Sequence, residues 1–390
     1  MTDELFKDDA YVSEFEAEIT SVDGDYVTLG GTAFYPSGGG QVCDTGIIGG
    51  VKVVEVKEAD GEIVHKVPGH RFSVGDRIWC SVDWDRRYDL MKGHTAEHLL
   101  FNSLHRQDPE LNIVKIFISP ESKYVIVDRD IGWDKISVAV RFANKIILEN
   151  HSVRRSVMSK DDPDISKIRV KLDRIEEDEI NVVEIEDVDL AACCGIHVME
   201  TEEIGAIFVS KKTSAGKDGV EIHFEIGEKA VDESMSLATS CLSIIDGLGS
   251  KPSDIERTIS NMKHELESCK RMLKESTISM IRTLKPVNIR GVDVYAGIFH
   301  TSDRSVLTDA AERYKEDGAV AAFIGVGDNL TVLLASRDKR VDCKKLISET
   351  LSEFGGRGGG KPDFAQGGVA DTAMKERILE SLMKGIERSL

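Results

Sequence analysis

Residues 86–105, RRYDLMKGHTAEHLLFNSLH, mark the point where this sequence changes from a strand-like to a helical pattern. Apolar residues recur at helical spacing through Leu104, and no proline interrupts them. We therefore expect a helix that begins close to His94. His94 and His98 would lie one turn apart on the same face of that helix, a separation that one metal ion can bridge.

The histidine pair alone is a weak sign of a metal site. It lacks the glutamate of the zinc-protease motif, because Thr95 stands where that base is required. A second segment, AACCGIHVME at residues 191–200, adds Cys193, Cys194 and His197 around a glycine. A thiolate and an imidazole from this segment would complete a tetrahedral zinc site with the two helical histidines. The alternative is that the cysteines are small buried apolar residues and the histidine lies in an ordinary strand.

The region before the helix has a different pattern. Residues 15–85 form short alternating runs separated by glycine turns, which predict an antiparallel sheet or small β-barrel over residues 1–89. The segment AFYPSGGGQVCDTG contains a glycine run that lets the backbone approach another surface closely or form a hairpin loop. We expect a substrate-approach loop formed by Gly38, Gly39, Gly40 and Gln41.

The region after residue 90 predicts an α+β domain over residues 90–228, with a helix at 136–149 and a strand IRVKL at 168–172. Two helices follow over residues 229–285 as a linker, and Ser253 with Glu256 predicts a capping box at the start of the second. That helix has a heptad pattern, typical of a coiled coil within one chain or between two chains, and both alternatives stay open. The heptad positions are Ile259, Met262, Leu266, Cys269, Leu273, Ser276 and Met280.

Residues 286–390 alternate between strand-like and helical segments, which predicts a small α/β domain. Its segment FGGRGGGKPDFAQGG resembles the phosphate-binding loop of nucleotide triphosphatases, but Pro362 follows the lysine and the run follows a helix, so triphosphate binding is disfavoured. We expect a glycine-rich loop that binds RNA phosphates or a second copy of the chain. Its residues are Gly355, Gly356, Arg357, Gly358, Gly359, Gly360 and Lys361.

Charge and composition narrow the class of protein. Residues 229–390 hold equal numbers of basic and acidic residues, so the formal net charge of −19 falls on residues 1–228. A ligand with many phosphates would therefore bind more easily to the near-neutral C-terminal part. Seven scattered cysteines, an acidic N-terminus without a secretory signal and the lack of a long apolar run predict a cytoplasmic protein without disulfides.

The glycine segment at 33–46, HTAEH, the Cys-x-x-x-His of Cys193 to His197 and the glycine run at 355–361 occur in one order. Together they resemble the alanyl-tRNA editing proteins of the long AlaX type, which are relatives of the editing and C-terminal parts of alanyl-tRNA synthetase. The resemblance covers essentially the whole chain.

The resemblance implies a trans-editing hydrolase that deacylates tRNA(Ala) mischarged with serine or glycine. It implies one zinc ion per chain, bound by His94, His98, Cys193 and His197, and a C-terminal DHHA1 domain that binds tRNA and forms a homodimer. The fold would be α+β and multidomain: barrel, zinc-binding editing domain, helical linker and DHHA1-like domain. The chain departs from the family pattern at CCGIH, where CGGTH is usual, and at Lys115, near the place of a serine-recognising Thr or Gln.

Two other functions are compatible with these departures. One is a tRNA-binding or assembly protein whose editing pocket has become inactive, and the other is a deacylase for a different amino acid. A phosphoesterase that uses the last domain is disfavoured, because no Asp-His-His motif precedes that domain.

Overall fold

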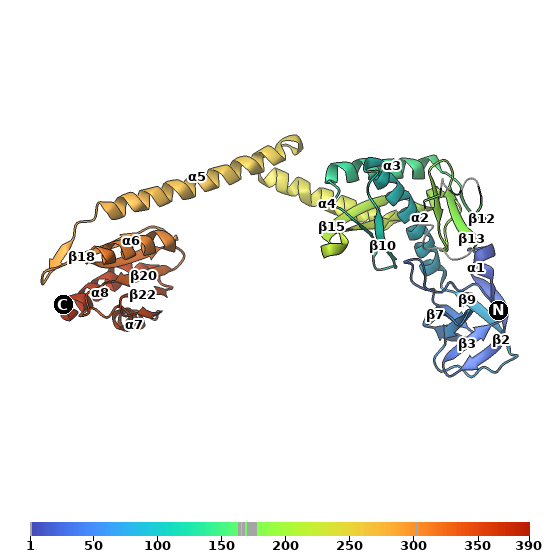
Figure 1. Ribbon diagram of the computed structural model, residues 1–390, viewed down its shortest axis with the longest axis horizontal. Coiled ribbons are helices and arrows are strands. Elements are labelled where there is room, and N and C mark those ends of the chain that lie inside the picture. The colour runs from blue at the N-terminus through green and yellow to red at the C-terminus, as the bar shows by residue number, and fades with distance from the viewer. Residues whose placement is uncertain (1, 163–164, 166–167, 170–177, 302) are drawn as a thin grey trace. The chain divides into compact units, whose positions relative to one another are not determined.

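The computed structural model describes residues 2–162, 165, 168–169, 178–301 and 303–390. The chain divides into two compact units, Met1–Ile244 and Ile245–Leu390 (Figure 1). Within the described residues, no helix combines the length and the apolar character that a membrane crossing requires.

The first unit begins with a seven-stranded sheet in the order β6-β5-β9-β2-β3-β8-β7. Its two edge strands, β6 and β7, follow each other directly in the chain, so the sheet nearly closes into the expected barrel (Figure 1). Alternate residues of β2 point into the core, since Phe15, Ala17 and Ile19 are buried between exposed glutamates. The strands are β2 (Glu14–Asp23), β3 (Tyr26–Leu29), β5 (Gly46–Ile48), β6 (Val51–Val53), β7 (Glu55–Ala59), β8 (Glu62–Lys66) and β9 (Arg77–Val82). A short pair, β1 (Asp3–Glu4) with β4 (Gly31–Thr32), and helix α1 (Leu5–Asp8) lie beside it.

Helix α2 (Trp84–Gln107) leaves the barrel and carries the histidine pair. The expectation that this helix begins near His94 is wrong, because the side chain of Asp83 accepts a hydrogen bond from Arg86 N–H and starts the helix earlier. The first turns are fixed by contacts with the barrel. Arg87 is fully buried, and its guanidinium binds the carboxylate of Asp44 and the carbonyl of Ala10. Arg87, whose charge would indicate an exposed position, therefore belongs to the buried face of the helix start.

Two further sheets, the helices α3 and α4 and two short 3₁₀ helices complete the description of this unit. A four-stranded antiparallel sheet has the order β10-β11-β16-β15, and a three-stranded one the order β12-β13-β14. The expected helix at 136–149 is present as α3 (Trp133–Glu149), whereas most of the expected strand at 168–172 lies outside the described residues. The remaining elements are β10 (Ile113–Ile118), β11 (Lys123–Val127), β12 (Val153–Ser159), β13 (Glu179–Ile185), β14 (Asp189–Ala192), η3 (Thr201–Ile204), β15 (Ile207–Ser214), η4 (Gly216–Asp218), β16 (Val220–Ile226) and α4 (Gly227–Gly247).

The second unit is a six-stranded sheet in the order β17-β18-β19-β20-β22-β21 with helices on both faces. Odd-numbered β19 residues such as Phe323 pack against α6, and even-numbered ones such as Ile324 pack against α7 and α8. This is the expected α/β domain. Its elements are β17 (Val287–Ile289), β18 (Val292–Phe299), α6 (Arg304–Glu316), β19 (Val320–Val326), β20 (Leu330–Ala335), α7 (Cys343–Glu353), β21 (Arg357–Lys361), β22 (Phe364–Val369), η6 (Thr372–Met374) and α8 (Lys375–Ser389).

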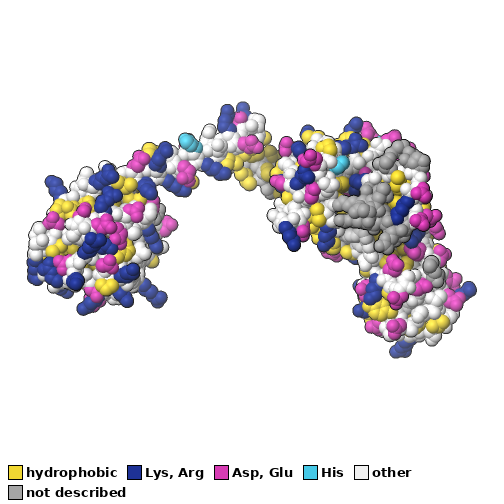
Figure 2. Space-filling view, viewed as in Figure 1, with side chains coloured by type: hydrophobic (Ala, Val, Ile, Leu, Met, Phe, Trp, Pro, Cys, Tyr) yellow, Lys and Arg dark blue, Asp and Glu magenta, His cyan; other side chains and the backbone are white. Residues whose placement is uncertain are grey.

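The long helix α5 (Ile255–Arg282) precedes this sheet. The expected capping box at Ser253 is absent, because Pro252–Asp254 forms a 3₁₀ turn and α5 begins after it. Acidic and basic side chains alternate over the surface of α5 (Figure 2). Five of the heptad positions are exposed large apolar side chains: Ile259, Met262, Leu266, Leu273 and Met280.

The glycine run at 355–361 is not the loop that its composition predicts. Arg357–Lys361 forms edge strand β21, paired antiparallel with β22. A Cβ atom on Gly358 would lie 2.4 Å from the side chain of Ile347, so α7 packs against the bare backbone. The absence of a side chain at Gly358 allows α7 to pack closely on the strand. The expectation of a glycine-rich loop is wrong for this reason.

Candidate metal centre

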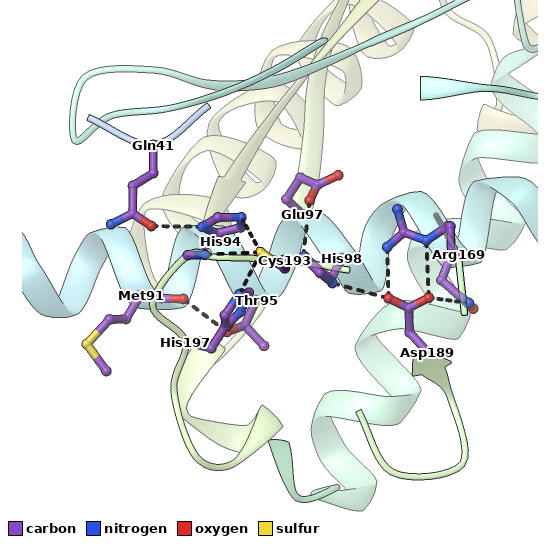
Figure 3. A network of polar contacts seen from close by, with 12 residues as sticks. Gln41, Met91, His94, Thr95, Glu97, His98, Arg169, Asp189, Cys193 and His197 are labelled. Carbon is purple, nitrogen blue, oxygen red and sulfur yellow. Dashed lines mark hydrogen bonds and ion pairs between the residues drawn. The ribbon is translucent and has the colours of Figure 1, made fainter. Parts of the chain in front are cut away.

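The structure brings together the four residues that the sequence analysis proposed as ligands. The donor atoms of His94, His98, Cys193 and His197 all lie within 4.8 Å of one another. His94 and His98 of α2 are buried, and the other two residues come from the turn after β14 (Figure 3). The sulfur of Cys193 lies 3.5 Å from Nε2 of His94 and 3.4 Å from Nε2 of His197.

A hydrogen-bond acceptor holds the outer ring nitrogen of each histidine. Nδ1 of His94 lies 2.8 Å from Oε1 of Gln41, and Nδ1 of His98 lies 3.2 Å from the Asp189 carboxylate. Nδ1 of His197 lies 3.1 Å from the hydroxyl of Thr95. Figure 3 shows these contacts around the cysteine sulfur.

The Thr95 contact fixes the direction of one of these bonds. Its hydroxyl donates its only proton to the carbonyl of Met91, so it must accept from His197. A carboxylate at Asp189 can only accept, as can Oε1 of Gln41. All three rings then carry the proton on Nδ1 and direct the lone pair of Nε2 inward, the arrangement that metal-binding histidines require.

The charges around the centre favour a thiolate at Cys193. Burial raises the pKa of this thiol, but the nearby His94, His197 and His98 together lower it well below its usual range. Burial also raises the pKa of Asp189, but His98 and Arg169 lower it by more, so its net shift is downward. Nη2 of Arg169 lies 2.8 Å from the carboxylate. Three imidazoles and one thiolate form a donor set that fits a borderline ion such as Zn²⁺.

Two glycines bring the backbone close to the centre. A Cβ atom on Gly195 would lie 2.2 Å from Cε1 of His94. A Cβ atom on Gly40 would lie 2.6 Å from the carbonyl oxygen of Ile116, and the φ of Gly40 is +87°. The glycine segment therefore packs against β10 and delivers Gln41 to His94. It does form a tight turn, since Gly38 bridges to Gln41.

Several residues of the centre were not identified as functional from the sequence. Asp189 and Arg169 are separated from the histidine motif by many residues, and only the fold brings them to His98. Glu97 is fully buried, and neither carboxylate oxygen has a hydrogen-bond partner among the described residues.

Lys115 is exposed on β10 and contributes no donor atom to the cluster.

Three family models match the chain. The model of tRNA synthetases class II (A) covers residues 5–86, the threonyl and alanyl tRNA synthetase second additional domain covers 180–220, and the DHHA1 domain covers 293–387. The matched segment at 180–220 contains the turn with Cys193 and His197.

Curated proteins and a solved structure are similar to the chain. The alanyl-tRNA editing protein AlaX-L of Pyrococcus horikoshii is 27% identical, over 100% of both chains. An alanine–tRNA ligase of Methanoregula boonei is 30% identical over 98% of this chain, which spans 44% of the ligase. The C-Ala domain of Aquifex aeolicus alanyl-tRNA synthetase aligns with 27% of this chain and 99% of its own length, at 22% identity and a TM-score of 0.25.

The matched domains define a class of proteins related to the editing and C-terminal parts of alanyl-tRNA synthetase. Within this class, the chain resembles over its full length an alanyl-tRNA editing protein of the long AlaX type.

Proposed function

We propose that the chain is a trans-editing hydrolase that deacylates tRNA(Ala) mischarged with serine and, to a smaller extent, glycine. The convergence of three oriented histidines and a thiolate in a chain of this family carries the proposal. Such a reaction would correct errors that the synthetase itself cannot prevent. A synthetase pocket rejects a substrate with one extra hydroxyl only weakly, so a second site that requires this hydroxyl supplies the missing discrimination.

We infer that His94, His98, Cys193 and His197 hold one zinc ion per chain. Bound zinc would supply a positive charge that orients the ester or a water molecule. Four protein ligands complete a tetrahedron, which favours a positioning role unless one ligand is displaced.

Two buried side chains near the centre can assist the reaction. Nε2 of Gln41 has no hydrogen-bond partner among the described residues, so it can donate to a carbonyl oxygen on which negative charge develops. The carboxyl group of Glu97 lies 3.9 Å from Nε2 of His98, and burial raises the pKa of Glu97. Its oxygens are available to a water molecule, since no other described group occupies them.

We further propose a division of labour along the chain. Residues 1–89 and 90–228 would form the barrel and the editing domain, and residues 229–285 and 286–390 would form the linker and the DHHA1-like domain. The latter two would contribute tRNA affinity and homodimer formation, through the exposed apolar positions of α5 and through Arg357 and Lys361 on β21. Their balanced charge repels phosphate less than the acidic first part does.

The deciding experiment compares hydrolysis of tRNA(Ala) charged with serine, glycine or alanine. We expect the serine ester to be hydrolysed fastest and the alanine ester to be spared. His98→Ala should abolish the activity, whereas His264→Ala, on the exposed surface of α5, should not change it.

A tRNA-binding protein without activity is the second candidate, favoured by the replacement of CGGTH with CCGIH. Tight binding of tRNA(Ala) with no hydrolysis of any of the three esters would support it and refute the proposed deacylase. Hydrolysis of a different ester would instead show a changed amino-acid specificity.

A further inference from the structure

A cavity of about 430 Å³ lies in the first unit beside the metal centre. Its walls come from α1 and the residues that follow it, from β12 and β13, and from the turn at 195–199. Gly195 and His197 line the cavity, and the same two residues contact His94 or supply a donor atom to the cluster. The volume falls within the range of about 300–1,000 Å³ that is typical of small-molecule sites.

The cationic side chains on this cavity differ in how their charge is balanced. Lys7, Arg154 and Arg155 line it. Nζ of Lys7 lies 2.6 Å from Glu4, and Arg154 lies 3.9 Å from Glu186. Within the described part of the chain, Arg155 has no carboxylate partner and is the cation whose charge is left uncompensated.

The hydrogen bonds of Arg155 go to neutral oxygens. Nη1 donates to the carbonyl of Lys7 at 3.2 Å, and Nη2 donates to Oδ1 of Asn181 at 2.7 Å. These bonds hold the guanidinium in place without neutralising it. The planar group retains further N–H donors, which suit a phosphate.

The cavity also contains acidic groups. Asp8 and Asp9 line it, and the Asp9 carboxylate accepts a hydrogen bond from Tyr11 N–H. Both carboxylates come from the N-terminal segment. The guanidinium of Arg155 contacts the carbonyl of Lys7 in that segment and the side chain of Asn181 on β13. A phosphate would therefore be favoured at Arg155 and disfavoured beside the carboxylates of Asp8 and Asp9.

Asn181 connects Arg155 to the turn that contains Cys193 and His197. The carbonyl of Asn181, whose side chain Arg155 contacts, accepts a hydrogen bond from Cys193 N–H at 2.9 Å. In an aminoacyl-tRNA, only the ribose of the terminal nucleotide separates the ester from the nearest phosphate. The apolar lining of the cavity includes Phe6, Val153 and Val198, which suit a sugar and a base.

We propose that this cavity binds the terminal nucleotide of aminoacyl-tRNA, with Arg155 contacting the phosphate on its 5′ side. The inference rests on the proposed deacylase function and names the place where that substrate binds. Because every tRNA ends in the same nucleotide, the cavity contributes affinity and alignment of the ester but no choice among tRNAs or amino acids.

The test uses the full-length protein and a stable substrate analogue, 3′-deoxy-3′-(serylamino)adenosine, with and without a 5′-phosphate. Calorimetry gives the Kd of each. We expect Arg155→Gln to weaken binding of the phosphorylated analogue about tenfold or more and to leave the other analogue nearly unchanged. Arg155→Lys should restore part of the loss. The matched control is Arg141→Gln on α3, which is exposed and outside the cavity.

A second variant tests occupation of the cavity itself. Val157→Trp adds a large side chain at an exposed position of the cavity wall, and both analogues should bind more weakly to it. Zinc content is measured for each variant, because Arg155 could otherwise act through Asn181 on the Cys193 turn.

The outcomes separate the two claims. Equal losses for both analogues in Arg155→Gln, no loss in either, or no binding to the unaltered protein would overturn the cavity assignment even if deacylation is observed. Phosphate-dependent binding in a protein that hydrolyses no aminoacyl-tRNA would uphold the cavity and refute the proposed activity.

Discussion

Gly195 lies so close to the ring of His94 that a Cβ atom at residue 195 would be 2.2 Å from Cε1. The glycine in the CCGIH segment is therefore required by a neighbour that is distant in sequence. This contact sets the position of His94 from one side, while Gln41 sets it from the other.

Gly195→Ala should displace His94 and weaken metal binding about tenfold or more, because backbone and ring cannot both keep their positions. The measurement is competition for zinc against a chelator of known affinity. Gly359→Ala is the matched control, since a Cβ atom there meets nothing within 4 Å. An unchanged zinc affinity in Gly195→Ala would show that the turn can move without cost.

Cys193, and not Cys194, is expected to be the thiolate ligand. The sulfur of Cys193 lies among the histidines. Cys194 is exposed as a residue, and partial burial of its thiol, together with the charge of Cys193, raises the pKa of that thiol. Elemental analysis of Cys193→Ser and Cys194→Ser should find zinc lost from the first and retained by the second. Greater loss from Cys194→Ser would reverse the assignment.

Asp189→Asn should lower zinc affinity by about 10–100-fold, as is typical when the partner of a metal-bound histidine is changed. The amide can present its NH₂ group to His98 and cannot neutralise Arg169, so the orientation of the ring is lost. Asp187→Asn, at an exposed position two residues earlier, serves as the control. Urea unfolding of both variants separates a loss of metal affinity from a general loss of stability.

His65 should make the barrel sensitive to acid. Burial lowers its pKa from 6.5 to about 4, although a hydrogen bond with the carbonyl of Val27 raises it slightly. The folded state therefore disfavours the protonated ring. Its contribution to stability is complete above pH 6.5 and declines by about 3 kcal/mol as the pH falls towards 4.

The measurement for His65 is the urea midpoint of the first unit at several pH values between 7 and 4. His65→Phe should flatten the decline, whereas His264→Phe on α5 should not. A decline of the same size in His65→Phe would assign the acid sensitivity to other groups.

A chain that ends at Gly249, after α4, should keep its zinc and its turnover at saturation but show a higher KM for charged tRNA. The second unit is expected to supply uniform binding, which changes KM and not kcat. Light scattering of the same protein tests whether dimer formation depends on α5. A normal KM with a much lower kcat would mean that the second unit completes the active site.

Much of the second unit could be predicted from the sequence, because its elements are set by local periodicity. The segments VDVYAGIF and Arg304–Glu316 coincide with β18 and α6. The start of α2 could not be found in this way. Asp83 caps it and Asp44 neutralises Arg87, and the second of these contacts depends on the barrel being folded.

The same distinction holds at the metal centre. The donors could be found from spacing, since His94 and His98 lie four residues apart on a helix and Cys193 and His197 four apart in a turn. Their hydrogen-bond partners could not, because Gln41 and Asp189 come from separate sheets or turns and carry no spacing signal. Secondary contacts of this kind are determined by tertiary packing alone.

The hydrogen bond from His94 to Gln41 would make the barrel a participant in the proposed metal binding, although the barrel supplies no ligand. The ring presents its inner nitrogen correctly when the glycine segment is docked on β10. Linkage is reciprocal, so metal binding must strengthen the docking of the barrel by the same free energy. A bound ion would then stabilise the contact between the barrel and the rest of the first unit. Removal of the ion would weaken this contact before either part unfolds.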